Sequence, residues 1–384
     1  MKAEPLLGGH ERPGRYFTEV SIFKAIVGSG GLALPKALGD MGVVPFALTM
    51  LAVWALSDCA LGWLATAAKD HPGVAGMHEL VERVLGPRSA VCVDVLHLFY
   101  SLGSCCAYVA FVQEALCHVL RVPSVGPESG LPAELVRLLI GLVCTALLAV
   151  RGWHPRAMGA ISFCGSVAIL LGYLVAAGAS LEQFKQQSQR PPVFTDTQGY
   201  FESAGKVVFL FCAHFTLATL IDGNASEFRQ AGRRAMAVAA AVNLVFGLTV
   251  GMLAYPRANS VIYTSFSGWF VDAAAIAVSL DLICTFPLPA KPGLLLLERA
   301  MPRGAANAVL GISATIISKL GFGVVITVAG AVTNIAGAFV FPPLLMIGMG
   351  AAHCWWPYVL LVAMAVLFAE FTVMDELSRM GQGA

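Results

Sequence analysis

The chain has 384 residues, of which 58% are apolar and only 12% are charged, and its formal net charge is +1. A soluble globular chain carries roughly 45–50% apolar and about 25% charged residues. The composition therefore excludes a disordered chain, a disulfide-stapled secreted domain and an ordinary cytosolic enzyme, and it predicts a lipid bilayer as the main environment. The small net charge argues against a nucleic-acid partner.

The first twenty residues are polar and contain proline and glycine. They lack the basic, apolar and small-residue order of a cleavable signal, so we expect the first apolar segment to remain and residues 1–17 to form a short cytosolic tail. A spanning helix needs about 20 apolar residues, so this length can hold roughly ten or eleven of them. In chain order, the apolar segments lie at about residues 18–38, 42–68, 89–119, 133–150, 155–181, 201–224, 235–254, 266–297, 305–349 and 353–374.

The segment 305–349 is too long for one helix. Lys319 and the sequence Gly321-Phe322-Gly323 divide it into a ninth and a tenth span, so about eleven spans are predicted. Residues 70–87 are expected to form a short amphipathic connector, and the polar segment 182–200 an extramembrane loop.

With this arrangement of spans, lysine and arginine are more frequent in the segments on the same side of the membrane as the N-terminus than in those on the opposite side. This bias predicts a cytosolic N-terminus, and an odd number of spans then places the tail 375–384 outside or in a lumen. The ten cysteines fall almost entirely in apolar segments without metal-ligand spacing, so neither a metal nor a cofactor is predicted.

The first span contains a run of helix-breaking residues, Gly28-Ser29-Gly30-Gly31. Inside a membrane, such a break is tolerated only where the freed backbone groups contact protein or line a cavity. The two ends of a broken helix offer N–H groups and carbonyl groups, which suit a carboxylate and a cation. The run therefore predicts part of a binding site near mid-membrane, although a seam of small residues for helix packing is the alternative.

Several stretches carry a resemblance to a known family. They are residues 23–36 (FKAIVGSGGLALPK), residues 78–86, residues 279–298 (SLDLICTFPLPAKPGLLLLE), and the glycines and prolines between residues 321 and 343. In this order, they resemble the amino acid/auxin permease family of amino acid transporters, from about residue 18 to the C-terminus. The first span is most similar to the proton-coupled and vacuolar branch of the family.

The resemblance implies a leucine-transporter-like fold, in which two inverted five-helix repeats are followed by one extra helix. The repeats would cover about residues 18–181 and 201–349 and the extra helix about 353–374, together forming a transporter domain at 18–374. Spans 1 and 6 would both be broken at the substrate site. In span 6, the break should lie near residues 211–219, where there is no glycine.

His214 lies at the expected second break and resembles the histidine of sodium-coupled members of the family. A histidine inside a membrane is costly and is a functional hypothesis by default. The alternative is a histidine that donates a hydrogen bond to a neighbouring carbonyl within the bundle.

Three carboxylates lie deep within predicted spans: Asp58, Glu114 and Asp281. A carboxylate buried in lipid must be paired or protonated, because its charged form is poorly solvated there. Asp281 is the preferred proton carrier, whereas an interhelical hydrogen bond without a transport role is the alternative for each of the three.

Lys24 lies one turn before the glycine run. Its ammonium group could take the place of a bound cation, and the lysine resembles that of the proton-coupled branch. The alternative is a lysine whose charge extends to the lipid headgroups along its apolar stem. Span 1 therefore favours protons as the coupling ion, while His214 favours sodium weakly.

The sequence thus predicts a secondary active amino acid transporter, most consistent with proton coupling, and not an enzyme. The expected substrate-binding residues are Gly28, Ser29, Gly30, Gly31, Tyr108, His214, Phe215 and Thr216. The expected proton-coupling residues are Lys24, His214 and Asp281, and an alternative sodium site would consist of Ala25, Gly28, Ser279 and Thr285. Sodium-coupled transport of neutral amino acids and a transporter-like amino acid sensor remain alternatives, and a plasma membrane and a vacuolar or lysosomal membrane are equally compatible.

Overall fold

The computed structural model describes residues 15–74, 76–123, 130–150, 155–185, 189–195, 197–211, 214–218, 221, 225–351 and 355–382. Within these ranges, the chain forms helices and no strand. Eight of the described helical segments are long and apolar enough to cross a membrane. The predicted class, an all-α multi-pass membrane protein, is therefore confirmed, whereas the count of about eleven spans stays a prediction.

The helices of the first half of the chain are α1 (Arg15–Ile26), η1 (Ser29–Ala33), α2 (Leu34–Met41), α3 (Val43–Asp70), α4 (Met77–Leu85), α5 (Pro87–Val119), α6 (Gly130–Ala149) and α7 (Pro155–Phe184). Those of the second half are α8 (Thr197–Phe211), α9 (His214–Leu217), α10 (Ala225–Ala254), η3 (Ile262–Ser265), α11 (Trp269–Thr285), α12 (Pro287–Ala300), α13 (Arg303–Ile317), η4 (Ser318–Leu320), α14 (Phe322–Ala329), η5 (Gly330–Asn334), η6 (Ala336–Val340), α15 (Phe341–Gly348) and α16 (Trp356–Gln382).

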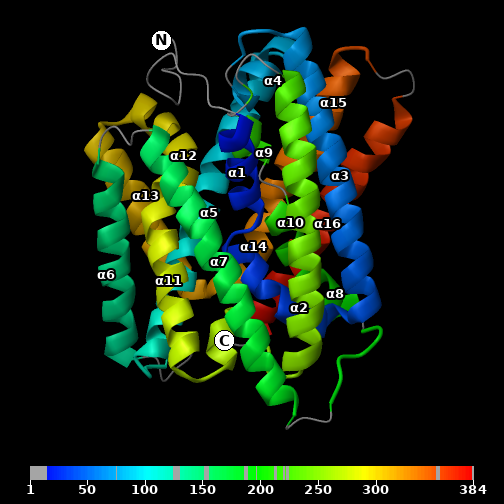
Figure 1. Ribbon diagram of the computed structural model, residues 1–384. Coiled ribbons are helices and arrows are strands. Elements are labelled where there is room, and N and C mark those ends of the chain that lie inside the picture. The colour runs from blue at the N-terminus through cyan, green and yellow to red at the C-terminus, as the bar shows by residue number, and fades with distance from the viewer. Residues whose placement is uncertain are drawn as a thin grey trace.

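Most helices run side by side between an upper end, near α4, and a lower end, near α2 and α8 (Figure 1). Helices α1, α5 and α14 lie towards the centre of the view, while α6 lies at one edge. Many large apolar side chains are exposed on α3, α6, α7 and α16, for example Leu142, Leu174 and Leu367. Such exposure is the normal state of a surface that lipid covers.

The first predicted span is interrupted where the glycine run predicts. Helix α1 ends at Ile26, and Gly28 has an extended backbone with φ −116° and ψ −161°. A short 3₁₀ helix, η1, follows and leads directly into α2. The Gly31 amide donates to the Gly28 carbonyl at 3.1 Å, a contact three residues apart, so the regular α-helical pattern is broken at this point.

Other predicted boundaries correspond to observed features. The amphipathic connector is helix α4. The division expected between the ninth and tenth spans coincides with a helix boundary at Gly321, whose φ of +85° lies in the region that favours glycine. After α14, the chain continues through two π-helical segments, η5 and η6, into α15. Helix α16 continues to Gln382, beyond the expected end of the extra helix at residue 374.

Helices α6 and α13 pack through a reciprocal arrangement of glycine and threonine. A Cβ atom added to Gly141 of α6 would overlap Thr315 Oγ1, and one added to Gly311 of α13 would overlap Thr145 Oγ1. Each threonine hydroxyl donates within its own helix, Thr145 to the Gly141 carbonyl and Thr315 to the Gly311 carbonyl. The hydroxyl groups are therefore satisfied, and the glycines let the two helices approach closely.

We predict that Gly141→Ala lowers the thermal unfolding midpoint of the purified protein, because the new methyl group forces α6 away from α13. Overpacking of this kind costs about 1–3 kcal/mol. Gly178→Ala on α7 is the matched control, since a Cβ atom there meets no neighbour within 4 Å. Equal unfolding midpoints for the two variants would contradict the packing argument.

Candidate ion and substrate site

A buried ion pair joins the last turn of α1 to α11. The Lys24 ammonium donates to Asp281 Oδ2. The two side chains are only 7% and 3% exposed. Since the charge of each group is compensated by the other, both can be accommodated in the interior of the bundle. The structure thus brings together two of the residues expected to take part in proton coupling.

A glycine on a third helix makes room for this ion pair. A Cβ atom added to Gly165 of α7 would overlap Asp281 Oδ1 and would lie 2.8 Å from Lys24 Nζ. Sequence reasoning did not identify Gly165, since a single glycine in an apolar helix carries no signal of its own. Only the packing of α7 against α1 and α11 shows why a side chain is excluded here.

Polar groups on α5 and α11 extend the ion pair on one side. The Thr285 hydroxyl donates to the Asp281 backbone carbonyl at 2.8 Å. Tyr108 of α5 lies in the neighbourhood of Thr285, Asp281 and Tyr100. Tyr108, an expected substrate-binding residue, is therefore a neighbour of the ion pair.

The residues of the alternative sodium site have different environments. Ser279 is 1% exposed and its hydroxyl has no hydrogen-bond partner within the described part of the chain. Thr285 is also buried, but its hydroxyl is already engaged with the Asp281 carbonyl. Ala25 is exposed and Gly28 is half-buried.

The glycines of the break are closely packed. A Cβ atom on Gly30 would lie 3.0 Å from Phe209 Cδ1 of α8, and one on Gly31 would overlap the Tyr173 hydroxyl. Tyr173 of α7 donates at 2.9 Å to Asn243 Oδ1 of α10. Tyr173 and Asn243 were not predicted, because nothing in the sequence places α7 and α10 against Gly31.

Ser29 lies in η1 beside these glycines. A surface cavity of about 390 Å³ between α3 and α10 does not include the glycine run in its lining. In this conformation, Gly30 and Gly31 are buried by protein side chains.

The expected second break can be described only in part. Helix α8 ends at Phe211, residues 212 and 213 and residues 219 and 220 lie outside the described residues, and α9 begins at His214. His214 is fully buried, and its Nε2 donates to the Ser57 carbonyl of α3 at 3.0 Å. Its Nδ1 has no hydrogen-bond partner within the described residues.

The two residues after His214 contact α5. Phe215 is buried, and its ring centroid lies 4.5 Å from that of His97 and 5.8 Å from that of Tyr100. The Thr216 hydroxyl donates to the Tyr100 hydroxyl at 3.0 Å. Tyr100 thus contacts Thr216 of α9 and lies in the neighbourhood of Tyr108, so residues expected at the substrate site in spans 3 and 6 lie near one another.

The other two carboxylates, which are half-buried, hold helices together. Asp58 of α3 accepts two hydrogen bonds from Arg229 of α10, at 2.6 and 2.7 Å. Glu114 of α5 accepts from the backbone N–H of Phe322, the first residue of α14, at 2.6 Å. These contacts are the interhelical type that the sequence left as an alternative for all three carboxylates.

A multi-pass helical bundle with an interrupted helix and a buried ion pair beside the break has the architecture of a membrane transporter. Comparison with known families agrees, because residues 18–373 match the model of the family described as "Transmembrane amino acid transporter protein". The chain belongs to this family, which confirms the resemblance seen in the sequence and the prediction of a transporter instead of an enzyme.

Two curated relatives support the assignment. The chain is similar to the amino acid transporter AVT3A of Arabidopsis thaliana, with 26% identity over 318 residues, which covers 77% of this chain and 71% of the relative. It is also similar to the amino acid transporter AVT3C of the same organism, with 24% identity over 374 residues, which covers 88% and 84% of the two chains.

We predict that Lys24→Met strongly destabilises the protein, because it leaves the Asp281 carboxylate buried without its cation. Removal of one partner of a buried pair costs about 3–5 kcal/mol, whereas replacement of both partners is far less harmful. The Lys24→Met/Asp281→Asn double variant should therefore unfold at a higher temperature than Lys24→Met alone. An additive loss of stability in the double variant would show that the two side chains are not energetically coupled.

We also predict that Gly165→Ala lowers amino acid transport about tenfold or more at equal amounts of folded protein, because its methyl group displaces the Asp281 carboxylate. A tenfold change corresponds to about 1.4 kcal/mol, which lies within the cost of a single overpacked methyl group. Gly178→Ala on the same helix should transport normally, since no atom opposes its Cβ. Normal transport by Gly165→Ala would remove Gly165 from the site.

Proposed function

We propose that this protein carries out secondary active transport of amino acids by alternating access, driven by a proton gradient. The observation that carries the proposal is the ion pair between Lys24 and Asp281, located beside the break in the first span. The family match and the names of the two relatives support amino acids as the substrate class.

The ion pair provides a reason for proton coupling. In the paired state, the Lys24 ammonium neutralises the Asp281 carboxylate. When a proton binds to Asp281, the ammonium loses the charge of its partner in a buried environment, which is unfavourable for the packed arrangement of α1 against α11. Proton binding therefore favours a displacement of α1, and α1 leads directly into the glycine run.

The proposed substrate site lies between the two breaks. The backbone N–H groups of Gly28, Ser29 and Gly30 would bind the substrate carboxylate, as the start of a helical segment favours negative charge. Gly31, whose N–H donates to the Gly28 carbonyl, would line the site. Tyr108, His214, Phe215 and Thr216 would contact the rest of the substrate, with the unpartnered Nδ1 of His214 as an acceptor for the substrate amino group. The packed state of Gly30 and Gly31 fits a closed conformation, so entry of substrate requires a rearrangement of the bundle.

Sodium coupling is the second candidate, through Ala25, Gly28, Ser279 and Thr285. The buried Ser279 hydroxyl without a described partner favours it. One observation favours protons over sodium: the Lys24 ammonium already compensates Asp281. A transporter-like sensor would bind amino acid without moving it, so a transport assay separates this third candidate from the other two.

The proposal includes the predicted topology. The end of the bundle that carries α4 would face the cytosol together with the N-terminus, and the end that carries α2 would face the outside or a lumen. Residues 18–181 and 201–349 would form the two inverted repeats, and α16 the extra helix.

We predict that purified protein in liposomes accumulates amino acid when a pH gradient is imposed in sodium-free buffer. A sodium gradient at equal pH on both sides should give no accumulation, because no sodium ion takes part in the cycle. Uptake of a radiolabelled amino acid mixture measures both conditions. Accumulation in the sodium gradient alone would overturn the proton assignment, and binding without uptake in either condition would favour the sensor.

We further predict that Asp281→Asn abolishes accumulation driven by the pH gradient. Asparagine resembles the protonated side chain in shape, but it cannot bind and release a proton. Exchange of external for internal amino acid needs no net proton movement and should be partly retained. A variant that still accumulates substrate against its gradient would exclude Asp281 as the proton carrier.

A further inference from the structure

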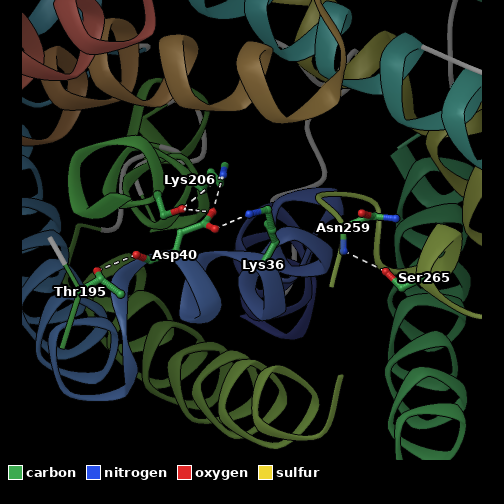
Figure 2. A network of polar contacts seen from close by, with 7 residues as sticks. Lys36, Asp40, Thr195, Lys206, Asn259 and Ser265 are labelled. Carbon is green, nitrogen blue, oxygen red and sulfur yellow. Dashed lines mark hydrogen bonds and ion pairs between the residues drawn. The ribbon is translucent and has the colours of Figure 1, made fainter. Parts of the chain in front are cut away.

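A second polar cluster lies at the lower end of the bundle, and none of its described contacts involves Lys24 or Asp281. Figure 2 shows Asp40 of α2 between Lys36 on one side and Lys206 on the other. Lys36, one turn earlier on α2, forms an ion pair with Asp40 Oδ1. On α8, the Ser203 hydroxyl donates to Asp40 Oδ2 at 2.9 Å, and Lys206 Nζ lies 3.5 Å from the same oxygen.

The carboxylate and one of the two lysines are largely removed from solvent, whereas the side chain of Lys36 is 37% exposed. The side chain of Lys206 is 2% exposed and that of Asp40 is 13% exposed. Two lysines thus share one carboxylate, one lysine from each helix. Without the charge of Asp40, the buried ammonium of Lys206 and the partly exposed ammonium of Lys36 would face each other and repel.

The backbone at the same position also binds the chain that joins α7 to α8. Residues 189–195, here called the strap, lie against the corner between α2 and α3. The Thr195 hydroxyl donates to the Asp40 backbone carbonyl at 2.7 Å, as Figure 2 shows. The first backbone N–H groups of α3 are bound as well, because Val43 donates to the Pro192 carbonyl at 3.0 Å and Val44 to the Val193 carbonyl at 3.1 Å.

The corner itself is shaped for the strap. Gly42 has φ +82°, and a Cβ atom there would lie 2.9 Å from the Val193 carbonyl oxygen and 3.0 Å from Phe194 Cα. These are backbone atoms, which cannot make room by a change of side-chain rotamer. Asp40 therefore contacts both α8 and the strap, and Gly42 lets the strap approach the corner between α2 and α3.

We propose that Asp40 is a positioning residue for transport, which holds α2, α8 and the strap together as one moving unit. This inference rests on the proposed function and extends it to the opposite end of the bundle. Helix α2 is continuous with the break in span 1, and α8 ends immediately before the expected break in span 6. If the two helices move together, the substrate path at this end of the bundle opens and closes at the same time as both breaks rearrange. If they move independently, substrate crosses without the coupling ion.

The test compares accumulation with exchange in liposomes. Asp40→Asn should lose accumulation at least about tenfold, within the usual range of coupling between sites, while exchange per folded protein stays within about twofold and downhill leak of substrate increases. A purely local structural role would lower accumulation and exchange in parallel with the amount of folded protein. An unchanged ratio of accumulation to exchange in Asp40→Asn would overturn the proposal.

A second experiment swaps the charges of Asp40 and Lys206. Asp40→Lys alone places three cations together and should fail to accumulate or fail to fold, and Asp40→Lys/Lys206→Asp restores one carboxylate between two lysines and should recover accumulation. A folded double variant without recovery would overturn the proposal, as would a double variant that does not fold, because the restored charge pattern then cannot hold the helices.

Asn259→Ala is the matched control. Asn259 lies at the same end of the bundle and contacts Ser265 and Thr264, but it has no described contact with Asp40. Asn259→Ala should keep the wild-type ratio of accumulation to exchange. Failure of the proposed function would show in the wild-type protein, which would not accumulate amino acid at all, whereas failure of the Asp40 proposal would show only in the variants.

Discussion

A helix that stops inside a membrane bundle must find partners for the backbone groups that its end sets free, because lipid offers none. In this protein, α1 stops at Ile26, one turn before Gly30, and the following 3₁₀ segment satisfies part of the requirement through the contact between Gly31 and Gly28. The rest of the break is kept away from lipid, because α7, α8 and α10 surround it. The position of the other helices thus depends on the need to cover this interruption.

The ion pair beside the break follows from the same constraint. The last turn of α1 carries Lys24, whose charge would be very costly if the helix end were buried without a carboxylate nearby. Asp281 of α11 provides the charge, and Gly165 of α7 provides the space. Three helices that are distant in sequence therefore meet at one pair of charges, so that a change in the charge of Asp281 acts on all of them.

The polar contacts at the two levels of the bundle differ in character. Around Lys24 and Asp281, one cation meets one carboxylate, and protonation of the carboxylate unbalances the pair. Around Asp40, two cations share a carboxylate with a serine hydroxyl, and two helices and the strap are joined. The first arrangement suits a group that changes its charge during a cycle, and the second suits a connection that stays closed throughout it.

The sequence by itself determined the membrane class, the family, the interruption at Gly28–Gly31 and the helix boundary at Gly321, because composition and runs of glycine act locally. It also indicated Lys24 and Asp281 individually, since charges within apolar segments are visible in one dimension. Only the tertiary structure decided that these two residues pair, and that Asp58 and Glu114 instead connect neighbouring helices. It also decided that Gly165 lies against the ion pair and that Tyr173 and Asn243 pack against Gly31. The physical reason is that such contacts depend on which helix faces which, and the apolar periodicity of lipid-covered helices does not encode their neighbours.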